Sequence, residues 1–205
     1  IARGLAYAHK KGVIHRDLKP DNILFDDNGE PFISDFGIAK LSEASGSLTG
    51  SGVIGTPAYM SPEQAQGGEI DGRSDVYGLG VIVYQMLSGQ QPYSADTPMG
   101  VVVKHITEPV PEILNANPDL PTAVDEIIKT ALAKDKSKRF ENPVEFAKAL
   151  NLLATGSAGD FTVHPTSMGR VGQKTGVMQL SRGMTSLVIT GVILLVLVTG
   201  FFLLR

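Results

Sequence analysis

Hydrophobic residues recur at helical spacing through most of residues 1–154. The run from Arg73 to Ser88 is apolar almost all round, which predicts a helix buried in a core. Serine, threonine or asparagine followed by proline marks several helix starts, because the side-chain oxygen caps the first turn and proline fits its first position. On these patterns we expect helices over residues 1–11, 61 to about 67, 73–88, 97–106, 124–132 and 142 to about 154.

Two short apolar runs, Ile23–Phe25 and Phe32–Ile33, predict a β-hairpin, because an Asn-Gly pair stands in the polar segment between them. Val13–Ile14 predicts one more very short strand. Folding the hairpin would bring Asn22, at one end, close to Asp35, at the other. Two such oxygen ligands suit a hard metal ion, so we expect a metal site there.

The pattern changes after residue 154. Residues 155–186 are rich in Gly, Ser and Thr with no apolar period, which is typical of a linker. Residues 187–204 are 18 uncharged, apolar residues that would form a helix roughly 27 Å long, about the hydrocarbon thickness of a bilayer. The alternative is a buried core helix, but no later segment could cover it. Arg170, Lys174 and Arg182 precede this stretch, so we expect a single-pass cell-membrane protein with the preceding chain in the cytoplasm and the C-terminus outside.

Charge and composition exclude other classes. Residues 1–154 carry 20 acidic against 14 basic residues, a net charge of −6, whereas residues 155–205 carry one acidic and four basic residues. An acidic body is a poor nucleic-acid binder, so we expect no nucleic-acid partner. The absence of cysteine excludes disulfides, cysteine-ligated zinc and a thiol nucleophile.

One stretch carries the candidate chemistry. His15–Asn22 reads His-Arg-Asp-Leu-Lys-Pro-Asp-Asn, and Asp35–Gly37 reads Asp-Phe-Gly. This pair resembles the catalytic loop and metal-binding triplet of protein kinases. The run Gly55–Gln64, with Ser-Pro-Glu where many kinases have Ala-Pro-Glu, is similar to bacterial, eukaryotic-like, receptor-type serine/threonine kinases. The resemblance covers residues 1–154.

The resemblance implies a fold and a domain order. We expect residues 1–154 to be a mainly α C-terminal kinase lobe whose small β-hairpin carries the catalytic and metal-binding loops. Residues 155–186 would be a disordered juxtamembrane linker, and residues 187–204 a transmembrane helix. The chain begins with Ile, inside a predicted helix, so we expect a fragment that lacks the N-terminal, nucleotide-clamping lobe and is inactive alone.

The resemblance also implies roles in phosphoryl transfer from ATP to Ser/Thr hydroxyls of proteins. Asp17 would take the hydroxyl proton, Lys19 would offset the phosphate charge, and Thr56 would help to recognise the acceptor. Asn22 and Asp35 would bind Mg²⁺, with two ions expected and Mn²⁺ as an alternative. The nucleotide-binding set is Lys19, Asp21, Asn22 and Asp35.

Further roles concern regulation and support. Thr49, Ser51 and then Ser47 are the expected activation-loop phosphosites, which Arg16 would pair with; the alternative is a plain solvated loop. A kinase dimer is a further expected partner. His15 and Phe36 would stack, and Gly37 would allow the turn after them. Glu63 and Arg139 would form a buried ion pair, and Asp75 would anchor the catalytic-loop backbone. His9, His105 and His164 are expected on the surface.

Two other function classes are the alternatives. A pseudokinase or docking module would need none of Asp17, Lys19, Asn22 and Asp35, so their presence favours an enzyme. A small-molecule phosphotransferase would not need the hydroxyl-rich loop or the Gly55–Glu63 segment, which suit a peptide substrate.

Overall fold

The computed structural model describes residues 1–36 and 57–155. The described chain is mainly helical, with one two-stranded antiparallel sheet, as the sequence predicts. The elements are α1 (Ala2–Lys10), η1 (Pro20–Asn22), β1 (Ile23–Phe25), β2 (Pro31–Ile33), η3 (Pro57–Tyr59), α2 (Pro62–Ala65), α3 (Gly72–Ser88), α4 (Pro98–Thr107), α5 (Ile113–Ala116), α6 (Ala123–Ala131), η4 (Lys136–Lys138) and α7 (Pro143–Ala154).

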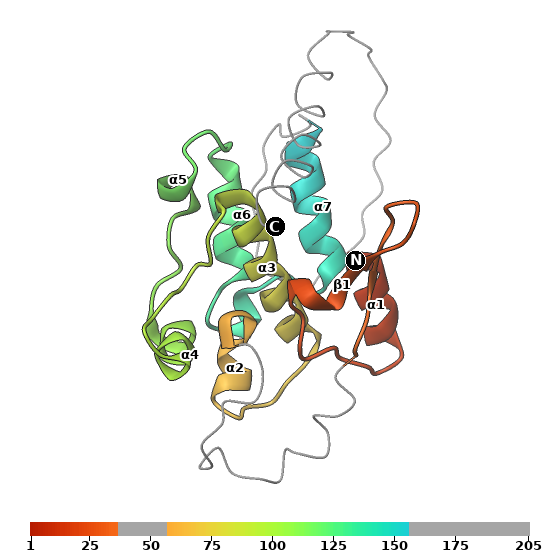
Figure 1. Cartoon of the computed structure of the whole chain (residues 1–205), viewed down its shortest axis with the longest axis horizontal. Helices are drawn as coiled ribbons and strands as arrows, with labels where there is room; N and C mark the ends of the chain where they lie inside the picture. Colours follow the sequence, from red (N-terminus) through yellow and green to blue (C-terminus); the bar gives the residue numbers. More distant parts are fainter. Residues whose placement is uncertain (37–56, 156–205) are drawn as a thin grey trace, which may run out of the picture.

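Helix α3 lies at the centre of the fold, and other elements pack around it (Figure 1). Its residues Val76, Tyr77 and Val81 have no exposed surface. Helices α6 and α7 contact α3, and α1 in turn packs on α7. The helix that is apolar on all sides therefore forms the core, as its composition predicts.

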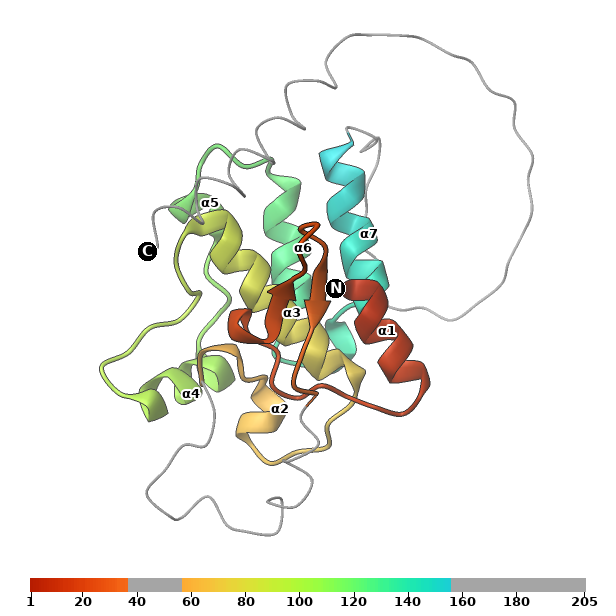
Figure 2. The same ribbon diagram turned by 45° about the vertical axis from the view of Figure 1, so that its right-hand side comes forward.

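The hairpin pairs Ile23 with Ile33 and Phe25 with Pro31. Its turn contains Gly29 in the left-handed region, with φ of 78°, and the Asp26 carboxylate accepts the Glu30 N–H at 2.8 Å. Beyond the last pair, the Ser34 N–H donates to the Asn22 carbonyl at 2.9 Å. The hairpin thus brings Asn22 and the residue before Asp35 together. Figure 2 shows the hairpin lying beside α1.

Val13–Ile14 does not form the predicted strand. The Val13 N–H bonds to the Ala8 carbonyl of α1 at 3.0 Å, and the Gly12 N–H bonds to the His9 carbonyl at 2.9 Å. With Gly12 at φ of 75°, these two bonds form a Schellman motif that ends α1. The backbone donor of Val13 is therefore used to close the helix instead of pairing with another strand.

The three helix starts predicted from Ser-Pro, Thr-Pro and Asn-Pro are present, each with its side-chain cap. Ser61 and Gln64 form a capping box at α2, Thr97 caps α4, and Asn142 caps α7. A further cap, not predicted from the sequence, is Asp71, whose carboxylate accepts the Arg73 N–H at the start of α3. These caps set the direction of the elements around the candidate site.

Candidate active site

The stretch His15–Asn22, called here the catalytic loop, is fixed by a carboxylate of α3. Asp75 is 1% exposed, and its two oxygens accept the backbone N–H groups of His15 at 2.8 Å and Arg16 at 2.9 Å. A buried charge needs such donors, because water cannot reach it. The helix at the centre of the core therefore holds the backbone of the loop directly.

His15 connects the loop to the end of the hairpin. Its Nε2 donates to the Ser34 carbonyl at 2.9 Å, and its Nδ1 accepts the Asp17 N–H at 3.3 Å. A carbonyl only accepts and an amide only donates, so these partners assign the tautomer with the proton on Nε2. The ring also packs against Phe36, with centroids 4.8 Å apart. The structure thus brings together the two residues expected to stack.

Three polar side chains meet at the loop. Lys19 Nζ lies 3.4 Å from the Asp17 carboxylate, and these side chains are 22% and 25% exposed. The Asn22 amide nitrogen donates to the Asp17 carbonyl at 2.8 Å, which leaves its amide oxygen for another partner. A partly exposed acid and cation therefore lie together, and the buried Asn22 side chain is fixed to the backbone of the same loop.

Asp35 lies where the hairpin returns to Asn22. It has φ of 51°, a left-handed conformation that is uncommon outside glycine, and Ser34 Oγ donates to its carboxylate at 3.3 Å. Carboxylate and amide oxygens fit Mg²⁺, so the donor set of Asn22 and Asp35 suits the predicted ion. Within residues 1–36 and 57–155 no group of three His, Asp or Glu residues could hold a metal alone. Asp21, the residue before Asn22 in the chain, is exposed.

A buried ion pair lies next to the α3 residues that hold the catalytic loop. Arg139, 1% exposed, donates from Nη1 and Nη2 to the two oxygens of Glu63, each at 2.7 Å. Ser74 Oγ donates to the same carboxylate at 2.6 Å. Burial raises the pKa of Glu63, but the hydrogen bonds from Arg139 and Ser74 outweigh it and keep this pKa below its ordinary value. The pair expected from the resemblance is in direct contact.

Two histidines were predicted wrongly. His105 is completely buried, with Nδ1 2.8 Å from the Tyr77 hydroxyl. His9 donates from Nε2 to the Asp75 carboxylate at 2.6 Å and so belongs to the support of the catalytic loop. Local spacing could not reveal either contact, because the partners lie 28 and 66 positions away. The sequence signal for these contacts is that each histidine lies on the same face of its predicted helix as the apolar residues.

Several predicted residues lie outside the described ranges. These are Gly37, Ser47, Thr49, Ser51, Thr56 and His164, together with the predicted linker after Thr155 and the predicted span 187–204. None of the helices formed by residues 1–36 and 57–155 combines the length and hydrophobicity that a membrane span requires.

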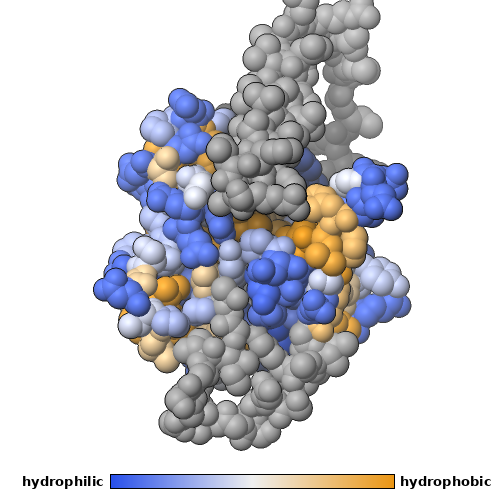
Figure 3. Space-filling view, in the orientation of Figure 1, coloured by the Kyte–Doolittle hydropathy of each residue, from blue (hydrophilic) through white to orange (hydrophobic). Residues whose placement is uncertain are grey.

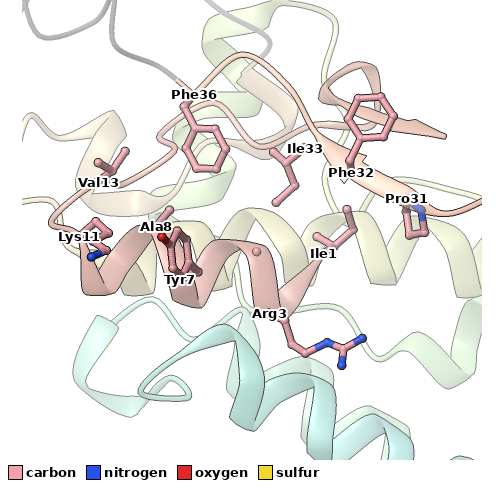
Figure 4. Close-up of a pocket in the computed structure, with 11 residues that line it drawn as sticks. Ile1, Arg3, Tyr7, Ala8, Lys11, Val13, Pro31, Phe32, Ile33 and Phe36 are labelled. Atoms are coloured by element: carbon pink, nitrogen blue, oxygen red, sulfur yellow. The ribbon is translucent and has the colours of Figure 1, made fainter. Parts of the chain in front are cut away.

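An apolar groove of about 680 Å³ lies beside the site, between α1 and β2. Figure 4 shows Tyr7 and Ala8 on the helix side, with Ile33 and Phe36 opposite them. The hairpin exposes three large hydrophobic side chains, Leu24, Phe25 and Phe32, and Figure 3 shows apolar surface where the hairpin meets α1. Phe36 therefore joins the groove to the His15 ring.

Comparison with known proteins gives consistent matches. The family model described as "Protein kinase domain" matches residues 1–151. The DNA damage-responsive serine/threonine-protein kinase RqkA of Deinococcus radiodurans is 42% identical over 177 residues, which is 85% of this chain and 26% of that protein. The serine/threonine-protein kinase drp72 of Corynebacterium efficiens is 45% identical over 161 residues, 76% of this chain and 29% of that protein. PknL of Mycobacterium tuberculosis, also named a serine/threonine-protein kinase, is 38% identical over 155 residues, 75% of this chain and 39% of that protein. The chain thus spans between about a quarter and two fifths of the length of these relatives.

Proposed function

Since the chain belongs to the bacterial serine/threonine protein kinase family, we propose that it carries the catalytic loop of an enzyme that phosphorylates Ser/Thr hydroxyls of proteins with ATP. One observation carries this proposal: Lys19 contacts the Asp17 carboxylate, Asn22 is bonded to the Asp17 backbone, and the hairpin returns the chain before Asp35 to Asn22. These residue types are the ones phosphoryl transfer requires, namely a base, a cation and two oxygen ligands.

The reaction forms a bond between the acceptor oxygen and the γ-phosphorus while the bond to the ADP oxygen breaks. Asp17 orients the hydroxyl and takes its proton. Lys19, within 3.4 Å of Asp17, offsets the negative charge that develops on the transferring group. Asn22 and Asp35 would hold Mg²⁺, which would neutralise phosphate charge when bound, and Asp21, the residue before Asn22, would add a carboxylate.

Regulation and acceptor choice form a second part of the proposal. Thr49, Ser51 and Ser47 are the phosphosites, Arg16 pairs with the added phosphate, and Thr56 contacts the acceptor hydroxyl. The hydroxyl-rich composition of this stretch supports the assignment, since a phosphate adds acceptors that match a guanidinium. A kinase dimer is the partner state proposed with it.

Membrane anchoring is the third part. The uncharged run at 187–204, preceded by basic residues, supports a single span with the kinase portion in the cytoplasm and the C-terminus outside. The residues before the span would form the linker.

The apolar groove between α1 and β2 supports the proposal that catalysis needs a second lobe. An apolar hollow next to Phe36 is surface that a nucleotide-clamping lobe would cover. We expect the isolated 205-residue chain to show no phosphotransfer with Mg-ATP. Autophosphorylation of that chain at Ser47, Thr49 or Ser51, detected by mass spectrometry, would refute the need for a second lobe.

The decisive experiment replaces Asp17, the proposed base. It is done in the full-length protein that contains this chain. Asp17→Asn keeps the shape of the side chain and removes the proton acceptor, so the phosphotransfer rate should fall by about 10²- to 10⁴-fold. Asp27→Asn, the same change at an exposed turn of the hairpin, is the matched control and should leave the rate unchanged. A wild-type rate in Asp17→Asn would refute Asp17 as the base, whereas no phosphotransfer by the wild type would favour a non-catalytic docking module.

A further inference from the structure

We propose that Gln64 is a positioning residue for Asp17; this rests on the function proposed above. Gln64 is the third residue of α2, and its side-chain amide contacts two backbone groups. Its Oε1 accepts the Ser61 N–H at 3.0 Å, and its Nε2 donates to the Arg16 carbonyl at 2.6 Å. The first contact is local, whereas the second reaches 48 positions back to the catalytic loop.

The chemistry of the two partners requires glutamine. A backbone N–H only donates and a carbonyl only accepts, so the amide satisfies both in one orientation alone. Glutamate has the same shape but presents a second oxygen to the Arg16 carbonyl. Methionine has a similar length and satisfies neither partner. Position 64 therefore favours glutamine through its two hydrogen bonds as well as through its volume.

The bond from Gln64 acts on the peptide unit that carries Asp17. The carbonyl of this unit is held by Gln64, and its N–H donates to His15 Nδ1 at 3.3 Å. A peptide unit is planar, so fixing its two polar atoms fixes the direction in which Asp17 leaves it. Arg16 itself has φ of 66°, a conformation that persists in a non-glycine residue only when its surroundings hold it.

Helix α2 is a firm support for this contact. Glu63, next to Gln64 in the chain, accepts Ser74 Oγ at 2.6 Å. Asp75, next to Ser74, accepts the Arg16 N–H at 2.9 Å. The contacts form a closed ring from Arg16 through Asp75, Ser74, Glu63 and Gln64 back to Arg16. The loop peptide is therefore braced from α3 on one side and from α2 on the other.

The test compares variants of the longest polypeptide containing this chain in steady-state phosphotransfer. Gln64→Glu should lower kcat by about tenfold or more at pH 8, with KM for ATP nearly unchanged, because misplacing a reacting group by about 1 Å can cost 10²-fold. As the pH falls from 8 to 6, the ratio of variant to wild-type kcat should rise, since a protonated carboxyl can donate to Arg16. Gln64→Met should show the loss without this recovery.

Ser61→Ala is the matched control. It removes the Ser61 Oγ bond to the Gln64 N–H, at 3.4 Å, and keeps the backbone N–H that Gln64 Oε1 uses. We expect it to lower stability and leave kcat unchanged. A Gln64→Glu variant with wild-type kcat, or with a loss that is the same at all pH values and equal to that of Ser61→Ala, would overturn the proposal.

A readout without catalysis separates this inference from the proposed function. Amide hydrogen exchange of residues 12–25 should be faster in Gln64→Glu than in wild type, and unchanged in Ser61→Ala. If the wild-type protein shows no phosphotransfer but exchange responds in this way, the bracing by Gln64 stands and the kinase assignment fails. Unchanged exchange in Gln64→Glu refutes the bracing whatever the activity.

Discussion

His9 reaches Asp75 because the first residue of α3 has no side chain. The His9 Nε2 lies 2.6 Å from the Asp75 carboxylate, which also holds the catalytic-loop backbone. A Cβ added at Gly72 would lie 2.6 Å from Nδ1 of His9 and 2.9 Å from its Cε1, closer than real Cβ contacts allow. Glycine at position 72 is therefore required by a close approach of the ring.

This close approach gives a prediction at the residue scale. Gly72→Ala should destabilise the protein by about 1–2 kcal/mol, because the His9 ring must shift and a hydrogen bond to a buried charge is weakened. Helix propensity alone predicts the opposite sign. Urea unfolding followed by circular dichroism measures the difference.

Gly4→Ala in α1 is the control for the Gly72 variant. Its added Cβ would meet only Ile33 Cδ1 at 3.7 Å, an ordinary contact. This control should stabilise by up to about 1 kcal/mol, as expected for a glycine within a helix. If Gly72→Ala is stabilised as much as Gly4→Ala, the His9 contact does not constrain this position.

At the scale of the element, the helix starts depend on side-chain caps. The side-chain Oδ1 of Asn142 accepts the N–H groups of Val144 at 3.0 Å and Glu145 at 3.1 Å, and α7 packs against α1, α3 and α6. Asn142→Ala should therefore cost about 1 kcal/mol of unfolding free energy. Asn151→Ala, the same change on the exposed side of the same helix, should cost nothing measurable. Equal effects in thermal or urea unfolding would show that the cap contributes nothing.

The local nature of these caps explains what the sequence could predict. Ser61 with Gln64, and Asn142 with Glu145, are signals within four residues, and the Asn-Gly turn of the hairpin is equally local. The contacts of Gln64 with Arg16 and of His9 with Asp75 are 48 and 66 positions apart, so they depend on how the finished elements pack. Val13 shows the limit for strands: its β-branched side chain favoured a strand, but its N–H was needed to end α1.

At the scale of the whole molecule, one buried histidine and two partly buried carboxylates of the described residues titrate in a way that lowers stability in acid. Burial lowers the pKa of His105 to about 4, and the charge of Lys134 adds to this effect. Burial raises the pKa of Asp71, but hydrogen bonds from Arg73 and Lys136 outweigh it and bring this pKa to about 2. The pKa of Glu63 is also below its ordinary value. In each case the unfolded chain binds protons at a higher pH than the folded one, so all three groups act in the same direction.

Of these three groups, His105 should be the first to lower the unfolding free energy as the pH falls. It lies between Tyr77, whose hydroxyl is 2.8 Å from Nδ1, and Tyr93, whose ring centroid is 4.9 Å away, while Lys134 Nζ donates to the His105 carbonyl at 2.7 Å. Between the unfolded pKa of 6.5 and the folded pKa of about 4, the unfolded state binds the proton and the folded state does not. Stability contributed by neutral His105 is full above pH 6.5 and is lost toward pH 4, at up to about 1.4 kcal/mol per pH unit. The carboxylates titrate lower and add to the loss only below about pH 5.

The final prediction therefore concerns the acid side of the stability profile. Wild type should lose unfolding free energy between pH 7 and pH 5, measured by urea denaturation at fixed ionic strength. His105→Phe keeps an aromatic ring beside Tyr77 and Tyr93 but cannot titrate, so its unfolding free energy should change much less over this interval. The variant should be less stable than wild type at pH 7, because the buried Tyr77 hydroxyl loses its partner. The two profiles should converge toward pH 5, and parallel profiles would exclude His105 as the group that titrates.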